Sequence, residues 1–583
     1  MMSPSLNVLD DVSLGQRLQM ARKAIRLTQQ EAADVLGVAR TTIVAIEKGE
    51  RKIQPEELIA LADKYDLSLN DLLRQRPAIG DLGVQFKAYF KRRGLADPAI
   101  GDRLEQAAAL LQQSAENYLD LEDKLQSPLP RNYPSEYEVG GLAVEAAADE
   151  VAEAERRRLG LGDGPLGNLR EVLETEVGLR IFALELDSRV SGLFGYTEEL
   201  GGCIALNSKH PPERQRMSLA HEYAHFLTAR GRPDVQVFRH AGRVPESERF
   251  AESFARRLLM PSRSVKRHLV NHMRQHGQPK VADLVHLSAY FRVSFEAYVR
   301  RLEELTLISP GTFDRLQFEN FKPREAQQLA GITQELPESR FPKRYTLLTL
   351  EALERGRITE GQAARYLATD RLDLRALQEQ YTRQIGLGAD GEPDWMTWQM
   401  DVDVTVRFLD ACGLINLYAS GQLTELARHQ GRPFVLVPNV VREASWIFER
   451  QGQERGGRVA ISFDPLIRGG VLEVIDSSTA VQRRFLQIAA ELDDGEAMTI
   501  AAAEGLDGAG VVTDDEAAIR YLKALDGPAV TSSLTLLRTQ LESADAADQR
   551  EALLNIRICA RYLPGPRHPE IEWWRATLIT EAS

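Results

Sequence analysis

The 583-residue sequence contains few cysteines, no long apolar run and no excess of basic residues. Its three cysteines, Cys203, Cys412 and Cys559, lie far apart without CxxC spacing. This argues against a disulfide framework or a thiolate metal site and favours a reducing compartment. No stretch approaches the roughly 18 continuous apolar residues of a membrane helix, and the N-terminus lacks the pattern of a signal peptide. We therefore expect a cytoplasmic protein with no membrane partner.

The formal net charge is −13, from 72 Lys and Arg and 85 Asp and Glu. This balance argues against a protein that coats nucleic acid through its overall charge, although one local nucleic-acid surface is compatible with it. The chain is also too long for a single hydrophobic core. We expect an all-α domain over 1–75, a helical connector over 76–135, an α+β domain over 136–305, a polar helical region with a linker over 306–399, and a parallel α/β domain over 400–563.

Two segments between these domains bear on how the protein assembles. Residues 101–127 place apolar side chains near heptad spacing. A helix that packs on its own domain and a coiled coil between two chains both fit this pattern, and the second arrangement would make the protein a homodimer. Residues 386–394, GLGADGEPD, are typical of a flexible linker.

The N-terminal domain carries the signals of two short helices joined by a tight turn. Thr28 is a good helix N-cap, and Glu31 three residues later completes a capping box. Gly37 ends this helix, and a second helix follows from about residue 40. Its size and polarity suit a helix that lies in the major groove of DNA, with its first residues near the base edges.

The stretch LTQQEAADVLGVARTTIVAIEKGE resembles the helix-turn-helix of the phage-repressor-like, xenobiotic-response-element (XRE) family of regulators. The resemblance implies that a double-stranded DNA operator is a partner and that Gln29, Arg40, Thr41 and Thr42 contact it. A helical module that binds a protein is the alternative. Residues 1–75 contain 10 Lys and Arg against 11 Asp and Glu, so they create no strong field for phosphates.

A metal-binding motif, HEYAH, begins at His221. On an α-helix, His221 and His225 lie on the same face and can bind one zinc ion together. Glu222 is too close in sequence to complete this set, and it is placed to accept a proton from the attacking water. The motif therefore predicts a zinc hydrolase.

A second predicted helix, over residues 247–261, supplies acidic side chains for the same site. Glu248 is expected to be the third zinc ligand, as in the His₂Glu sites of known hydrolases. Glu252 lies one turn later and is expected to hydrogen-bond the free nitrogen of a liganding histidine. Two helices together thus predict a complete zinc site.

This region resembles the ImmA/IrrE family of metallopeptidases over about residues 138–305. The resemblance is carried by VSGLFGY (190–196), CIALNSKHPPERQRMSLAHEYAHFL (203–227) and the FARRLLMP helix. It implies a zincin-like fold and a protein substrate of the repressor type, whose cleavage switches on genes in a stress response. A transcription factor whose zinc domain only senses or binds a partner is the alternative function.

Acidic residues recur in the C-terminal α/β pattern, namely Asp410, Glu443, Glu496, Asp514 and Asp515. Some follow predicted strands and others lie in adjacent helices, so they can converge at the carboxyl edge of a parallel sheet. Clustered carboxylates bind Mg²⁺ or Mn²⁺, and such a site suits phosphodiester hydrolysis. A phosphatase-like or receiver-like domain, and acids without a function, fit the same pattern.

The segments FLDACGLINL, VVREAS, DDGEAMTIAAAEG and VVTDDEAAIRYLKAL are together similar to the PIN domain of metal-dependent ribonucleases. The similarity implies Asp410, Glu443, Glu496 and Asp514 as Mg²⁺ or Mn²⁺ ligands, Asp515 as an auxiliary acid, and RNA as a partner. Many such domains are toxins, so a toxin–antitoxin or phage-defence protein is a further alternative. Because the predicted linker separates this domain from the peptidase, we expect its activity to be restrained until the peptidase acts, and two independent activities in one chain are the alternative.

The predicted fold is therefore multidomain. It combines an all-α helix-turn-helix, an α+β zincin-like metallopeptidase with a helical extension, and an α/β PIN-like parallel sheet.

Overall fold

The computed structural model describes residues 10–25, 27–74, 82, 98–140, 142–231, 234–237, 245–277, 279–332, 339–385, 404–525, 527–565 and 568–579. The chain divides into two compact units, each with its own hydrophobic core: Met1–Arg76 with Thr346–Ser583, and Pro77–Tyr345. Of the helices in these ranges, none is long and apolar enough to cross a membrane.

Five helices form the N-terminal bundle of the first unit: α1 (Asp11–Ala24), α2 (Gln29–Leu36), α3 (Arg40–Glu47), α4 (Pro55–Tyr65) and α5 (Leu69–Leu73). The capping box is present, because the Thr28 hydroxyl accepts a hydrogen bond from the Glu31 N–H and the Glu31 carboxylate accepts one from the Thr28 N–H. Gly37 ends α2 at φ 64°, where glycine avoids the strain of a side chain. The predicted helix-turn-helix is therefore the observed one.

The bundle shares its unit with the C-terminal domain through a polar contact at α5. The Asp494 carboxylate accepts hydrogen bonds from the Ser68 hydroxyl and from the backbone N–H groups of Leu69 and Asn70. The fully buried Asn70 amide donates to the Ala489 carbonyl. A carboxylate at the first turn of a helix satisfies N–H groups that have no partner within the helix.

A five-stranded sheet forms the centre of the C-terminal domain, in the order β11-β10-β5-β6-β9. All neighbouring strands pair in parallel, which confirms the predicted parallel α/β sheet. Its strands are β5 (Val406–Leu409), β6 (Phe434–Leu436), β9 (Leu472–Val474), β10 (Ala509–Val512) and β11 (Ala529–Thr531). A separate hairpin, β7 (Trp446–Gln451) and β8 (Glu454–Ala460), was not expected from the sequence.

Helices connect the strands and extend the domain beyond them. They are α20 (Ala411–Ala419), α21 (Leu423–Gln430), α22 (Pro438–Glu443), α23 (Phe463–Arg468), α24 (Thr479–Ile488), α25 (Asp494–Glu504), α26 (Glu516–Ala524), α27 (Ser533–Gln540), α28 (Ala546–Cys559) and α29 (Ile571–Ile579). Helix α25 is buried along most of its length and packs against β5, β10 and α22. It therefore brings its first turn to the edge of the sheet.

The predicted polar helical region is divided between the two units. Helix α17 (Lys343–Glu354) crosses the boundary, and α18 (Glu360–Tyr366) and α19 (Arg371–Ile385) belong with the C-terminal domain. The predicted linker 386–394 lies outside the described residues.

The second unit is built on a four-stranded mixed sheet in the order β1-β3-β2-β4. Strands β1 (Arg180–Leu184) and β3 (Gly201–Asn207) are parallel, whereas β2 (Val190–Thr197) runs antiparallel to β3 and to β4 (Asp234–Val237). Its helices are α7 (Pro98–Lys124), α8 (Val144–Arg158), α9 (Leu169–Val172), the π-helical turn η1 (Leu173–Val177), α10 (Pro212–Thr228), α11 (Glu246–Leu259), α12 (Ser262–His276), α13 (Val281–Tyr290), α14 (Phe295–Glu304), α15 (Thr312–Phe318) and α16 (Pro323–Leu329).

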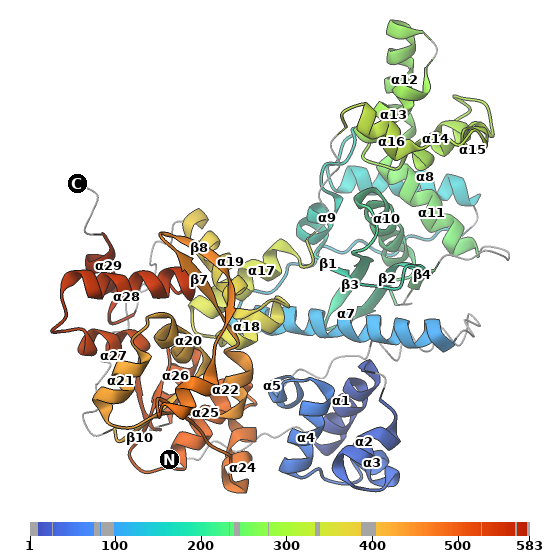
Figure 1. Ribbon diagram of the computed structural model, residues 1–583. Coiled ribbons are helices and arrows are strands. Elements are labelled where there is room, and N and C mark those ends of the chain that lie inside the picture. The colour runs from blue at the N-terminus through green and yellow to red at the C-terminus, as the bar shows by residue number, and fades with distance from the viewer. Residues whose placement is uncertain are drawn as a thin grey trace. The chain divides into compact units, whose positions relative to one another are not determined.

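The long helix α7 packs on the sheet of its own unit. Figure 1 shows α7 and α10 on opposite sides of this sheet, and α7 contacts β1 and β3. The buried Arg180 side chain of β1 donates to the Glu122 carboxylate of α7 at 2.8 Å. Of the two arrangements that the heptad-like spacing left open, the structure therefore contains the helix that packs on its own domain. The buried residues of α7 include Leu104, Ala108, Leu111, Ala115 and Tyr118.

Candidate metal centres and DNA-binding helix

Helix α10 carries the HEYAH motif and lies between the sheet and α11. It contacts β2 and β3 on one side and α11 on the other, so nearly all of its side chains from Gln215 to Leu227 are buried. The central Tyr223 of the motif faces the core, where its hydroxyl donates to the buried Glu155 carboxylate of α8. Packing on the other faces of α10 therefore fixes the positions of His221 and His225.

His221, His225 and Glu248 come together as the sequence predicted. The Nε2 atoms of His221 and His225 are 3.2 Å apart, and His221 Nε2 lies 3.4 Å from Glu248 Oε2. One ligand atom from each residue lies within 4.8 Å of the others, so a single ion can reach all three. Two imidazole nitrogens and a carboxylate oxygen are the ligands of His₂Glu zinc hydrolases, with one position open for water or substrate. The residues present therefore fit zinc.

Glu222 is fully buried against the backbone of β2. A Cβ atom at Gly192 would lie 2.6 Å from Glu222 Oε1, a distance that side chains do not tolerate. The glycine in the β2 sequence VSGLFGY therefore makes room for the carboxylate. Sequence reasoning quoted this segment for its resemblance to a family but did not identify the role of the glycine.

The structure does not bring Glu252 to the histidines. Its side chain is exposed on α11, and none of the hydrogen bonds among the described residues joins it to His221 or His225. The buried face of α11 is taken by apolar residues such as Phe254 and Ala255. His221 Nδ1 makes no hydrogen bond within the described part of the chain. The outer-sphere role of Glu252 stays a prediction.

The predicted DNA-contacting residues lie at the start of α2 and α3. Arg40 and Thr41 are exposed and Thr42 is half-buried. The Gln29 amide donates to Glu47 at 2.9 Å, and its oxygen accepts a hydrogen bond from Arg40 at 3.2 Å. Because Glu47 is buried and fixed, it holds Gln29 in place, and Gln29 in turn orients the Arg40 guanidinium.

Acidic side chains meet at the carboxyl edge of the C-terminal sheet, in two groups that share Glu496. Ligand atoms of Asp410, Cys412 and Glu496 lie within 4.8 Å of one another, and so do those of Glu443, Asp493 and Glu496. Asp410 Oδ1 accepts a hydrogen bond from the Gly413 N–H, as the N-cap of α20. The three carboxylates of the second group are ligands that a hard divalent cation prefers, whereas in the first group only Asp410 and Glu496 are.

Burial strongly perturbs these carboxyl groups. It raises the pKa of Asp410 to about 8, with a further contribution from the nearby Asp514 and Asp515. Burial also raises the pKa of Glu496 well above its usual value. Two oxygens, Asp410 Oδ2 and Glu496 Oε2, are buried and make no hydrogen bond to any described residue. Burial therefore disfavours the charged form of these carboxyl groups unless a cation lies beside them.

Asp514 and Asp515 do not join either group. Asp514 Oδ2 accepts hydrogen bonds from the Asn416 amide at 2.8 Å and from the Ser533 hydroxyl. Asp515 caps α26, and its other oxygen accepts a hydrogen bond from the Glu360 N–H at 2.6 Å. Their predicted roles as ligand and auxiliary acid stay predictions, since the structure places them beside the two groups.

Three residues at this edge were missed from the sequence. Asp493 directly precedes α25, and its place three residues before Glu496 is a signal that could have found it. Cys412 entered the sequence analysis only as one of three widely spaced cysteines. Arg371 carried no signal, because its position near the acids depends on how α19 packs rather than on a motif.

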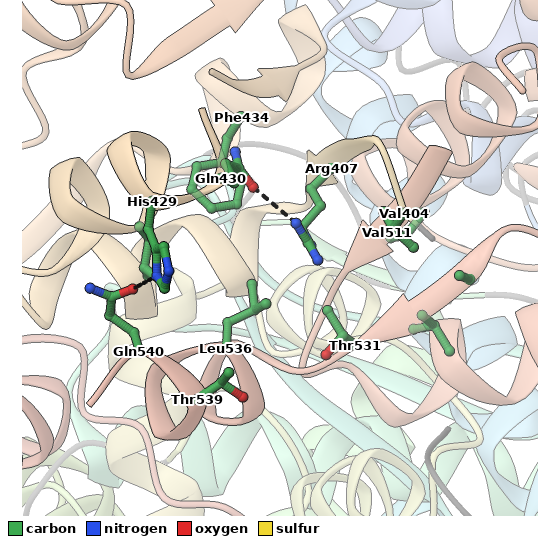
Figure 2. A pocket seen from close by; sticks show the side chains of 14 residues that line it. Val404, Arg407, His429, Gln430, Phe434, Val511, Thr531, Leu536, Thr539 and Gln540 are labelled. Carbon is green, nitrogen blue, oxygen red and sulfur yellow. Dashed lines mark hydrogen bonds between the residues drawn. The ribbon is translucent and has the colours of Figure 1, made fainter. Parts of the chain in front are cut away.

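A cavity of about 240 Å³ lies at the opposite edge of the same sheet (Figure 2). Its lining includes the first residues of parallel strands, among them Arg407, and side chains of α21 and α27. Arg407 donates to Gln430, and His429 pairs with Gln540. None of the residues that line this cavity is acidic, so it is separate from the cation groups.

Comparison with known families supports two of the three predicted domains. Residues 174–303 match the family model of the IrrE N-terminal-like domain, a peptidase family, and residues 18–72 match that of the helix-turn-helix. These two matches do not reach the C-terminal sheet domain, so the parallel sheet is observed while the PIN fold remains a hypothesis. No curated protein and no solved structure is similar to the chain.

We expect His221→Ala to lower the zinc affinity of the full-length protein by roughly 100-fold or more. Even the loss of an outer partner of a zinc ligand costs about 10- to 100-fold. Competition with a fluorescent zinc chelator measures this affinity. His286→Ala changes an exposed histidine of α13 and should retain the wild-type affinity. Equal affinities of the two variants would contradict the zinc site.

Proposed function

We propose that the protein is a DNA-binding regulator whose IrrE-like domain is a zinc endopeptidase that cleaves a repressor-type protein in a stress response. The match to a peptidase family over 174–303 and the match to the helix-turn-helix family over 18–72 support the two halves of this proposal. The single observation that carries the peptidase half is the meeting of His221, His225 and Glu248 around one point, next to the buried Glu222.

The residues of the site would divide the work of peptide hydrolysis. His221, His225 and Glu248 would hold the zinc ion, which when bound polarises a carbonyl group and lowers the pKa of water. Glu222 would accept a proton from the attacking water and deliver it to the leaving amine. Its burial against Gly192 limits the positions that its carboxylate can take, which favours proton transfer along one path.

Glu222→Gln should retain zinc but lower the rate of substrate cleavage by roughly 1000-fold, because only the proton acceptor is removed. The full-length protein is incubated with repressor-type proteins encoded beside its gene, with and without a chelator, and cleavage is followed on gels. Glu213→Gln, in the first turn of the same helix, is the control. Cleavage by Glu222→Gln at the wild-type rate would instead favour a transcription factor with a non-catalytic zinc domain.

For DNA binding, we propose that Arg40, Thr41 and Thr42 read the operator and that Gln29 supports Arg40. Arg40→Ala should weaken binding by about 1–3 kcal/mol, or roughly 5- to 150-fold in Kd, and relax the preference at one base pair. Fluorescence anisotropy on operator variants measures both effects. Lys64→Ala, an exposed cation on α4, should leave the base preference unchanged. An unchanged preference in Arg40→Ala would favour the protein-binding alternative. The homodimer and the cytoplasmic location stay predictions.

A second candidate function is a metal-dependent ribonuclease in the C-terminal domain. Two groups of acids that share the buried Glu496 lie at the carboxyl edge of a parallel sheet, where substrates of such folds bind. Mg²⁺ or Mn²⁺ held there would stabilise the charge that develops on a phosphodiester. This activity would make the protein a toxin-like or phage-defence protein as well as a regulator.

Asp410→Asn should lower Mn²⁺-dependent degradation of single-stranded RNA by roughly 100-fold, since it removes one anionic ligand and several kcal/mol of charge stabilisation. The full-length protein is assayed at millimolar Mn²⁺ with a fluorescently labelled RNA. Asp464→Asn, an exposed acid of α23, is the matched control. RNA degradation that is equal in the two variants would show that a contaminant, or another part of the chain, is responsible.

A further inference from the structure

Arg371, the first residue of α19, lies within one of the two acidic groups. Its Nη2 atom is 2.5 Å from Glu443 Oε2, 3.2 Å from Glu496 Oε1 and 3.7 Å from Asp493 Oδ2. A single cationic nitrogen thus contacts all three carboxylates whose oxygens could meet around a metal ion. The guanidinium therefore occupies the position that a divalent cation would take.

The Arg371 side chain is buried. It is 8% exposed, and Nη1 contacts Glu360 at 3.4 Å and Cys412 at 3.5 Å. Asp493 also pairs with Arg365, so two guanidinium groups face these three carboxylates and one negative charge is left unbalanced. Glu496 Oε2 and Asp410 Oδ2 are buried without a hydrogen bond to the described residues, which is costly unless a further cation or proton is near. The site thus has the chemistry of a cation site that an arginine fills in part.

Helices α18 and α19, which carry Gly361 and Arg371, pack closely against this edge of the sheet. A Cβ atom at Gly361 of α18 would lie 1.6 Å from Asp493 Oδ2 and 2.9 Å from Arg371 Nη2, so only glycine allows α18 to approach so closely. The Asp515 carboxylate accepts a hydrogen bond from the Glu360 N–H at 2.6 Å. Arg375 pairs with Glu360 and donates to the Ala560 carbonyl at 2.8 Å.

We propose that α18 and α19 form a built-in inhibitor of the C-terminal domain, in which Arg371 competes with a divalent cation for Glu443, Asp493 and Glu496. This inference rests on the proposed nuclease, because it names how that site is regulated. The cation binds fully only after Arg371 withdraws, since two cations cannot share one position among the same oxygens. The restraint that the sequence led us to expect would then act on the metal site itself.

The test measures Mn²⁺ binding to the zinc-loaded, full-length protein by electron paramagnetic resonance, in which free Mn²⁺ is counted directly. Arg371→Gln should bind one Mn²⁺ roughly 10- to 100-fold more tightly than the wild type. In the wild type Arg371 leaves the site open in only a small fraction of molecules, and the apparent affinity falls in proportion to that fraction. Arg371→Lys keeps the charge and should stay near the wild type. Arg355→Gln removes an exposed arginine near α18 and should change nothing.

Adding Glu496→Gln to Arg371→Gln should abolish the gain, since Glu496 belongs to both acidic groups. Arg371→Met is a second route to the same state, because it removes the guanidinium and fills the same buried space with an uncharged side chain. It should also raise Mn²⁺ affinity, and it keeps the test decisive where Arg371→Gln folds poorly. Wild-type Mn²⁺ affinity in both Arg371→Gln and Arg371→Met would overturn the inhibitor.

RNA degradation by the same variants separates this inference from the ribonuclease. Tighter Mn²⁺ binding in Arg371→Gln without RNA cleavage by any variant would support the inhibitor and reject the ribonuclease. Conversely, wild-type protein that degrades RNA as fast as Arg371→Gln at micromolar Mn²⁺, with loss of activity in Asp410→Asn, would support the ribonuclease and reject the inhibitor. Faster cleavage by Arg371→Gln than by the wild type would support both.

Discussion

Burial of carboxylates is the constraint on which both candidate metal centres depend. A carboxylate that leaves water must gain hydrogen-bond donors, a proton, a guanidinium or a metal ion, because its desolvation costs several kcal/mol. Glu222 is buried where the chain also gathers His221, His225 and Glu248. Glu496 is buried where the chain supplies Arg371. The two sites therefore meet the same physical demand in different ways, one with ligands for an ion and one with a cationic side chain.

The sequence predicted the local features that depend on residues close together in the chain. The capping box at Thr28, the shared face of His221 and His225, and the parallel sheet all follow from spacing and alternation. Glu248 was also placed with the histidines, from the acidic residues of the helix predicted over 247–261. The capping box and the shared face of the histidines required no knowledge of how distant segments pack.

What the sequence could not predict depends on contacts between distant segments. Arg371 reaches Glu443, which is 72 residues away, only because α18 packs against the sheet edge at Gly361. Asp514 belonged to the expected ligands by position in the motif, yet its carboxylate is engaged by Asn416. A motif specifies which residue types occur, but the hydrogen bonds that each carboxylate makes follow from the three-dimensional neighbours.

The first turn of α25 connects the cation groups with the N-terminal bundle. Asp494 holds the first turn of α5 through Ser68, and the adjacent Asp493 pairs with Arg365, which also lies 3.4 Å from Asp71 of the bundle. Arg365 and Arg371 belong to the same segment and contact the same carboxylate, Asp493. Movement of that segment would therefore change the ion pairs of the bundle together with those of the cation site.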